Sequence, residues 1–225
     1  MALILPTIAH RLRSEKTHRC VEGRGFDSRH LHHTTLAGRP CLGSGNRSVS
    51  SREPCRVGLV SLHRPSPDPV GPGQESVWSY PRPPALERVE RHVCVRLGGL
   101  VIAETKHALR VLETSHPPTY YVPHNGVEWS FFEPAVGTSF CEWKGDATYW
   151  TVTAGTASVV GRAWSYQNPS RSFAAIAGAV AFYPAHFECY VDDERVRPQP
   201  GEFYGGWITD EIKGPFKGIP GSMWW

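Results

Sequence analysis

Aromatic residues are distributed unevenly along the 225-residue chain, and this distribution limits where a folded core can form. All eight Trp and all eight Tyr follow Gln74, and Phe26 is the only Phe before it. Residues 1–74 also lack a sustained helical or strand period, and they are rich in Gly, Pro, Ser and Arg. Such a segment buries too little apolar surface to offset the entropy of folding. We therefore expect a disordered tail over residues 1–74 and a single folded domain over residues 75–225.

The net charge changes sign at the same place. Residues 1–74 carry eleven Lys and Arg against five Asp and Glu, a net charge of +6. Residues 75–225 carry thirteen basic and sixteen acidic side chains, a net charge of −3. The basic excess of the whole chain therefore belongs to the tail, and nucleic acid is not the expected partner of the domain.

The tail permits three interpretations. It is a basic, solvated segment, or an arm that binds nucleic acid, or a stretch that is not made at all. The third follows from the run Gly23–His33, which resembles a translation of the 3′ end of a transfer-RNA gene, because the T-loop sequence encodes Gly-Phe-Asp-Ser in one frame. On this hypothesis the gene start is assigned too far upstream, and translation begins near Val60.

Cysteine spacing and hydropathy bear on the compartment. None of the six Cys residues forms a Cys-x-x-Cys pair, so we expect no zinc, and the cofactor remains open. Cys94, Cys141 and Cys189 are widely spaced in the domain, as in a protein with reduced thiols. No apolar run is long enough to cross a bilayer, and Met1–Ala9 lacks the features of a signal peptide. We expect a cytoplasmic protein with no membrane partner.

Hydrophobic alternation predicts a mainly β domain. Apolar residues alternate on both sides of Gly98–Gly99 and predict a hairpin within Arg91–Glu104. A tight hairpin turn requires positive φ, which glycine adopts readily. A second hairpin is predicted around Gly155, and His107–Glu113 fits either a helical turn or an irregular strand. The other segments predicted to be extended are Tyr120–Pro123, Val127–Phe132, Phe140–Trp143, Ala147–Thr153, Ala157–Trp164, Phe187–Val191 and Arg195–Arg197.

One segment departs from this pattern. Pro169–Phe182 places Phe173, Ile176 and Val180 at spacings of three and four, and a proline stands at its start, so it predicts the one helix of the domain. Pro198–Trp225 contains six Gly and four Pro with aromatic residues between them, and we expect an ordered coil that covers the sheet.

Arg110–Pro123 contains the first candidate site. His116 precedes the rigid Pro117–Pro118 corner, and its ordinary pKa near ~6.5 suits an acid or a base at neutral pH. Glu113 is placed to orient it, so both are candidate catalytic residues. The structural alternative is that His116 only hydrogen-bonds the backbone to fix the corner.

Cys141–Gly145 contains the second candidate site. On a strand, Glu142 and Lys144 share one face and form a charged pair at a pocket mouth, while Cys141 and Trp143 share the other. Cys141 is a nucleophile if His116 lies near it, and otherwise a buried apolar residue, which is the commoner role of a free cysteine.

Aromatic residues are unusually frequent in the domain, and those in coil next to Gly or Pro are suited to line a cavity. Their rings favour a planar or cationic ligand, and Arg110 and Lys144 favour an anionic group on it. The candidate ligand-binding residues are Arg110, Tyr120, Glu142, Trp143, Lys144, Trp164, Tyr166, Tyr204 and Trp207.

Several motifs together resemble one bacterial family, filed as domain of unknown function 427 and also labelled NTP-transferase-like. The motifs are Val77–Pro84, Leu109–Pro118, Tyr120–Pro123, Cys141–Gly145, Ala163–Tyr166, Ala181–Pro184 and Arg197–Trp207. The resemblance implies a small β-tent-like fold, but no settled activity. Relatives of that fold that hold zinc do so through paired Cys-x-x-Cys motifs, which this chain lacks.

The transferase label has little support among the residues themselves. Nucleotidyl transfer commonly uses paired carboxylates around Mg²⁺, and the only tight cluster is Asp192–Glu194, which its flanks identify as a turn. We therefore expect a domain that binds a small planar or anionic molecule in an aromatic-lined pocket. The alternatives are a nucleotidyltransferase-like or His116-dependent enzyme, and a protein-interaction module that uses the aromatic C-terminal segment.

Overall fold

The computed structural model describes residues 65–225, which form a mainly β structure as predicted. The expectations for residues 1–64 lie outside this range. Residues 65–74, assigned above to the tail, contact the folded part: the backbone N–H of Asp68 donates to the Gly214 carbonyl over 2.8 Å, and the Gln74 amide donates to the Asp210 carbonyl over 3.1 Å. No helix in the described part is long and apolar enough to cross a membrane.

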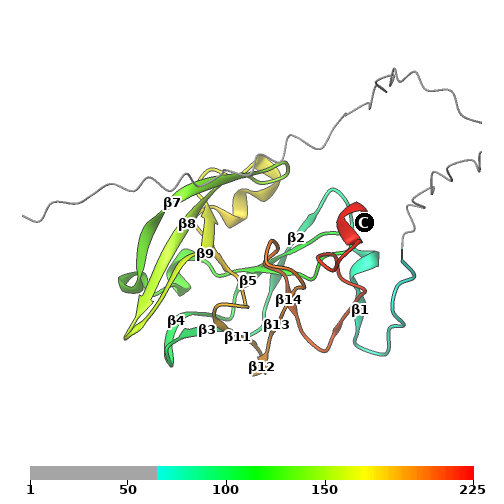
Figure 1. Ribbon diagram of the computed structural model, residues 1–225, viewed down its shortest axis with the longest axis horizontal. Helices are drawn as coiled ribbons and strands as arrows, with labels where there is room; N and C mark the ends of the chain where they lie inside the picture. The colour runs from blue at the N-terminus through cyan, green and yellow to red at the C-terminus, as the bar shows by residue number, and fades with distance from the viewer. Residues whose placement is uncertain (1–64) are drawn as a thin grey trace, which may run out of the picture.

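One sheet consists mainly of long antiparallel strands at one end of the molecule (Figure 1). In spatial order its strands are β10 (Val180–Phe182), β9 (Ala157–Tyr166), β8 (Gly145–Ala154) and β7 (Phe132–Cys141). The hairpin predicted around Gly155 is confirmed, with φ of 60° at that residue. The strand predicted over Phe140–Trp143 is wrong beyond Cys141, because the chain reverses there to pair Cys141 with Gly145.

The other two main sheets are also antiparallel. The second contains β12 (Glu194–Arg195), β11 (Glu188–Val191), β3 (Val93–Leu97) and β4 (Leu100–Thr105). The third contains β2 (Ala85–Val89), β5 (Ala108–Leu112) and β6 (Thr119–Tyr121). The predicted hairpin between β3 and β4 is confirmed, with φ of 58° at Gly98 and 81° at Gly99. The segment that fitted either a helical turn or a strand is β5.

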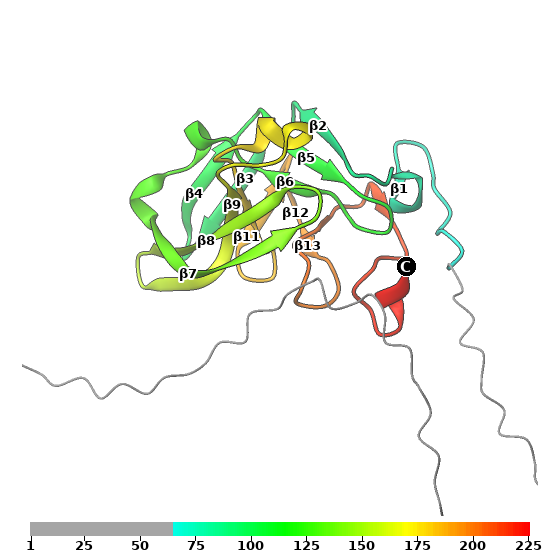
Figure 2. The same ribbon diagram turned by 90° about the horizontal axis from the view of Figure 1, so that it is seen from above.

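Short pairings tie the chain ends and the sheets together. Parallel strands β1 (Glu75–Ser76) and β15 (Ile212–Lys213) join the two ends of the described chain, and antiparallel β13 (Arg197–Pro198) pairs with β14 (Trp207–Ile208). Val122 and Val180 exchange two backbone hydrogen bonds of 2.8 and 2.9 Å, which link β6 to β10. Figures 1 and 2 show the C-terminal residues folded back beside β1, away from β7 to β9.

The helices of the described part are short 3₁₀ helices. They are η2 (Val77–Ser79), η3 (His124–Gly126), η4 (Trp129–Phe131), η5 (Arg171–Ile176) and η6 (Ser222–Trp224). The predicted helix over Pro169–Phe182 is correct only for η5, because Gly178 at φ 70° turns the chain and its last three residues pair with β9. The predicted strand Val127–Phe132 is wrong over its second half, because η4 occupies Trp129–Phe131 and only Phe132 belongs to a strand, as the first residue of β7.

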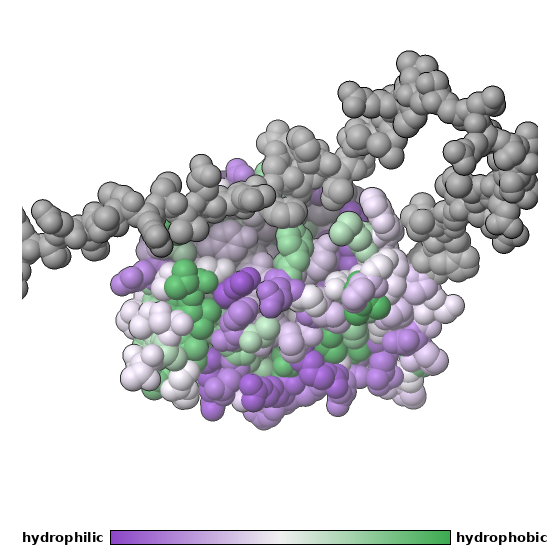
Figure 3. Space-filling model, viewed as in Figure 1, coloured by the Kyte–Doolittle hydropathy of each residue, from purple (hydrophilic) through white to green (hydrophobic). Residues whose placement is uncertain are grey.

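The main core lies between the sheets and includes Val95, Ile102, Val152, Phe182 and Trp207. A second cluster packs Tyr121, Trp164 and Tyr166 against the residues of η5. On the surface drawn in Figure 3, hydrophilic side chains gather along the edge that carries β11 and β12, and hydrophobic surface is limited to separate patches.

Candidate functional site

The corner after β5 holds His116 in a fixed place against the returning C-terminal segment. Ser115 has φ of 71°, so the chain turns sharply just before the histidine. The Ser115 N–H donates to the Val77 carbonyl over 3.0 Å, and the Lys217 N–H donates to the Ser115 carbonyl over 2.9 Å. Backbone groups from both ends of the domain therefore fix the corner.

Gln199 determines the tautomer of His116. Its buried amide accepts from the Gly206 N–H through Oε1 over 3.2 Å, and donates through Nε2 to the Lys217 carbonyl over 2.8 Å. These two bonds fix which end of the amide is the donor. The same Nε2 lies 3.0 Å from Nδ1 of His116. Nδ1 therefore accepts a hydrogen bond, and the neutral ring carries its proton on Nε2.

The surroundings of the ring also keep it uncharged. Burial, followed by the positive charges of Lys217, Arg82 and Lys144, lowers the pKa of His116 to about 3. Nε2 has no hydrogen-bond partner among residues 65–225. At neutral pH the ring therefore presents one fixed N–H donor without an acceptor in the described part of the chain.

Charged side chains of both signs lie in the neighbourhood of the His116 ring. Arg82 lies between two carboxylates, with Nη1 3.2 Å from Glu113 Oε1 and Nη2 3.3 Å from Glu142 Oε1. Burial raises the pKa of Glu113, although Arg82 and Lys144 act in the opposite direction. Lys144 and Lys217 form no ion pair with an Asp or Glu of the described chain. Three cations thus face two carboxylates around His116.

Tyr204 covers one side of the imidazole. The two rings meet edge to face, with centroids 4.5 Å apart and an interplanar angle of 75°. Phe203 contacts Tyr204 in the same way at 4.8 Å and is mostly exposed. The site therefore has an aromatic boundary on the coil between β13 and β14, where sequence reasoning placed Tyr204.

The two glycines after Tyr204 allow this coil to pack tightly. A Cβ at Gly205 would lie 2.3 Å from Cη2 of Trp164, and a Cβ at Gly206 would lie 2.3 Å from Oε1 of Gln199. A side chain at Gly206 would therefore displace the amide that orients His116. These positions require glycine for close approach, not for an unusual φ.

Aromatic side chains support the turn that carries Lys144. Its ammonium group lies 5.9 Å from the ring centre of Tyr166 and 5.7 Å from that of Phe173, distances typical of cation–π contacts. Tyr166 and Trp164 are buried, and Trp143 is partly buried against the same cluster. Tyr166 therefore supports Lys144 from a packed cluster, and Trp164 belongs to the same buried cluster and not to an open wall. Glu142 and Lys144 lie on a turn, so the strand argument for their shared face was wrong.

Trp207 and Tyr120 belong to the main core, which corrects their predicted place in a cavity wall. Their ring centroids are 5.1 Å apart, and the Trp207 indole N–H donates to the Phe182 carbonyl over 3.0 Å. Trp207 is 0% exposed and Tyr120 is 2% exposed. Trp207 was predicted to line a cavity because it follows two glycines in coil, but this sequence context does not reveal that its ring points into the core.

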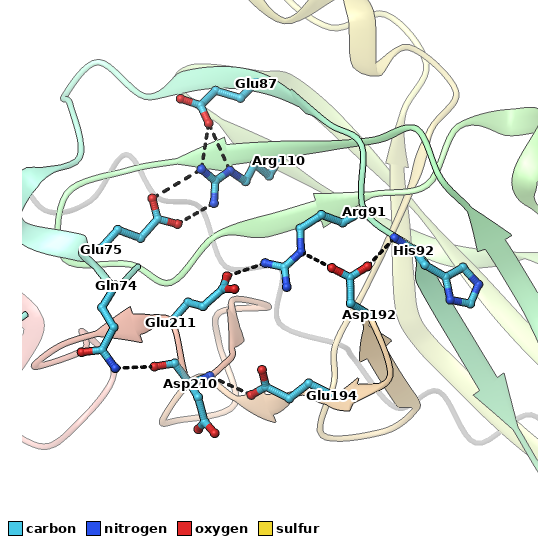
Figure 4. Close-up of polar contacts among 10 residues, drawn as sticks. All are labelled: Gln74, Glu75, Glu87, Arg91, His92, Arg110, Asp192, Glu194, Asp210 and Glu211. Carbon is cyan, nitrogen blue, oxygen red and sulfur yellow. Dashed lines mark hydrogen bonds and ion pairs between the residues drawn. The ribbon is translucent and has the colours of Figure 1, made fainter. Parts of the chain in front are cut away.

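Arg110 belongs to a separate network of ion pairs (Figure 4). Its Nη1 lies 2.5 Å from Glu75 Oε1, and its Nη2 lies 3.0 Å from Glu87 Oε2. Arg91 is paired in turn with Asp192 and Glu211. These residues border a polar pocket of ≈ 290 Å³, whose lining includes Glu75, Glu87, Arg88, Arg91, Arg110 and Glu211. Because protein carboxylates already bind Arg110, it is not an available anion ligand, contrary to the sequence interpretation.

The acidic turn between β11 and β12 is confirmed as a turn, with φ of 46° at Asp192 and 69° at Asp193. Asp192 accepts from the His92 N–H over 2.8 Å, and Glu194 accepts from the Asp210 N–H over 2.7 Å. Two of the three carboxylates thus bind the protein itself. Within residues 65–225, no three His, Cys, Asp or Glu side chains lie close enough together to hold a metal ion.

Sequence analysis named five of the residues at this site and missed three. Glu113, Glu142, Lys144 and Tyr204 lie in the neighbourhood of His116. Arg82, Gln199 and Lys217 were not proposed. Gln199 and Arg82 stand within the motifs that carry the family resemblance, which was the one available signal. Nothing in the local sequence distinguishes Lys217.

The fold and the site define a mainly β domain with a partly buried, neutral histidine beside a cluster of mixed charge. Residues 85–194 match the model of a family described as domain of unknown function 427 and labelled NTP_transf_9, the family that the motifs resemble. The match contains Glu113, His116, Glu142 and Lys144. A search of curated proteins found no match.

Proposed function

We propose that this domain binds a small anionic molecule at the surface around His116. The observation that carries the proposal is the Gln199 amide, which holds His116 as a neutral ring with its proton on Nε2. An N–H donor without a protein acceptor suits an oxygen atom of a ligand. Lys144, which forms no ion pair with an Asp or Glu of residues 65–225, supplies positive charge that an anion requires.

The arrangement favours binding over acid–base catalysis by His116. A general base needs a pKa near the working pH, and burial with three nearby cations holds the pKa of His116 far below it. Tyr204 and the exposed Phe203 give the ligand an aromatic boundary.

We also infer a cytoplasmic location, for which the free thiols of Cys94, Cys141 and Cys189 give support.

A thermal-shift screen of the full chain tests the proposal, with inorganic phosphate, small carboxylates, and nucleotides with and without Mg²⁺ as probes. A ligand at one hundred times its Kd adds ~2.7 kcal/mol to the stability of the folded state. We expect an anion to stabilise the protein without a metal ion, and we expect the same anion to stabilise the Lys144→Gln variant less than the wild type. Lys106→Gln is the matched control, because Lys106 is an exposed lysine outside the site.

Three results would contradict the proposal. The first is that no probe stabilises the protein, and the second is that Lys144→Gln and Lys106→Gln reduce the stabilisation by the anion equally. The third is stabilisation that occurs only with a nucleotide and Mg²⁺. The last result would support the transferase alternative.

A further inference from the structure

A polar pocket of ≈ 290 Å³ shares no residue with the site around His116. Its walls come from the start of the described chain, from β2 and β5, from the link between β2 and β3, and from the residue before β15 (Figure 4). The volume is close to the lower end of the range for small-molecule sites, roughly 300–1,000 Å³. Three carboxylates and three guanidinium groups balance in charge among its lining residues, which include Glu75, Glu87, Glu211, Arg88, Arg91 and Arg110.

Ion pairs hold the charged walls of this pocket in place. Arg110 joins β5 to β1 and β2, because its Nη1 lies 2.5 Å from Glu75 Oε1 and its Nε lies 3.1 Å from Glu87 Oε2. Its Nη2 lies 3.0 Å from Glu87 Oε2 and 3.4 Å from Glu75 Oε2, so all three nitrogens of this guanidinium are bound. Side chains that are fixed before a ligand arrives lose less entropy when it binds.

The same pairs leave hydrogen-bonding capacity of both kinds unused. Arg91 binds Asp192 Oδ2 through Nε over 2.6 Å and Glu211 Oε2 through Nη1, and its Nη2 has no partner among residues 65–225. Glu87 and Glu211 each accept through Oε2, and neither Oε1 has a partner within that part of the chain. A guanidinium has five N–H donors, and a carboxylate accepts at both oxygens. The lining residues therefore offer a donor nitrogen and two acceptor oxygens.

We propose that this pocket binds a small zwitterion of the amino-acid class, which carries one ammonium and one carboxylate. The ammonium donates to the unused oxygens of Glu87 and Glu211, and the carboxylate accepts from Nη2 of Arg91. An ion of a single sign satisfies only one of these two sets and disturbs the charge balance of the lining, whereas a zwitterion adds no net charge. The inference is independent of the proposed anion site, because the two share no residue.

Thermal-shift measurements on the full chain test the inference, with the common amino acids as probes. Propionate and ethylammonium are the single-charge controls, because each keeps only one of the two charged groups of alanine. We expect at least one amino acid with an uncharged side chain to stabilise the protein, and ethylammonium to give no shift. Any shift with propionate should depend on Lys144, at the proposed anion site, and not on Glu87.

Glu87→Gln and Glu133→Gln are the matched variants, because both glutamates are exposed on strands but only Glu87 lines the pocket. Arg110 keeps Glu75 as its partner in Glu87→Gln, so the variant should fold. In calorimetric titration with the stabilising amino acid, Glu87→Gln should raise the Kd about tenfold, the loss expected for one hydrogen bond to a charged group. Glu133→Gln should leave the Kd unchanged.

The inference would be overturned if no amino acid stabilised the protein, or if Glu87→Gln and Glu133→Gln raised the Kd equally. Stabilisation by ethylammonium equal to that by the amino acid would indicate a cation site instead. A loss of amino-acid binding in Lys144→Gln, with Glu87→Gln unaffected, would place the amino acid at the proposed anion site. This inference and the proposed function therefore fail by different results.

Discussion

Replacing Trp207 by alanine is expected to lower the free energy of unfolding by about 3–5 kcal/mol, the range for removing a large aromatic side chain from a core. Its ring is fully buried, packs on Tyr120 at 5.1 Å, and donates to the Phe182 carbonyl. The variant leaves a cavity between the sheets and removes the donor for a buried carbonyl. Urea unfolding followed by circular dichroism measures the loss.

Trp224 provides the matched control, because it is the same residue type at 64% exposure. Trp224→Ala should change the free energy of unfolding by no more than ~0.5 kcal/mol. Trp207→Phe keeps a ring in the core, so its free energy of unfolding should lie between those of Trp207→Ala and Trp224→Ala. A Trp207→Ala variant as stable as Trp224→Ala would contradict the buried position of Trp207 and would restore its candidacy as a ligand-binding residue.

Acid should destabilise the wild-type protein through His116. The unfolded chain takes up a proton at a pKa near ~6.5, whereas the folded ring has a pKa of about 3. Between these values the unfolded state binds more protons, so stability falls as the pH decreases. The loss attributable to this residue between pH 7 and pH 5 is about 2 kcal/mol.

His116→Gln isolates the effect because glutamine does not titrate. The variant is less stable at pH 7 through its lost contacts, but its stability should fall less between pH 7 and pH 5 than that of the wild type. Glu113 is present in both proteins, and its raised pKa acts in the opposite direction, so the difference belongs to His116. Parallel pH dependences for the two proteins would show that the ring is accessible to protons in the folded state.

The hairpins of the fold were predictable because their signals are local. Gly98–Gly99 and Gly155 have the positive φ that tight turns require, and apolar alternation flanks them. The errors fall where tertiary contacts prevail over local pattern. Pro169–Phe182 has helical spacing, yet pairing of its last residues with β9 ends the helix after two short turns.

The candidate site was half predictable for a related reason. His116 and Glu113 lie in one segment, and Glu142 and Lys144 lie in another, so each pair was visible in the sequence. Gln199, which sets the state of His116, is 83 residues away along the chain. Arg110 looked available because the carboxylates that bind it come from Glu75 and Glu87, and no local pattern connects the three.

The central claim is that His116 is a neutral ring with its proton on Nε2, held so by Gln199. Nitrogen-15 NMR of the histidine rings tests it most directly, with the His116 signals assigned by their absence from His116→Gln. We predict a single neutral tautomer protonated at Nε2 and unchanged from pH 8 to pH 5, and loss of that fixed tautomer in Gln199→Met. A ring that titrates near its ordinary pKa, or one that carries its proton on Nδ1, would contradict the account.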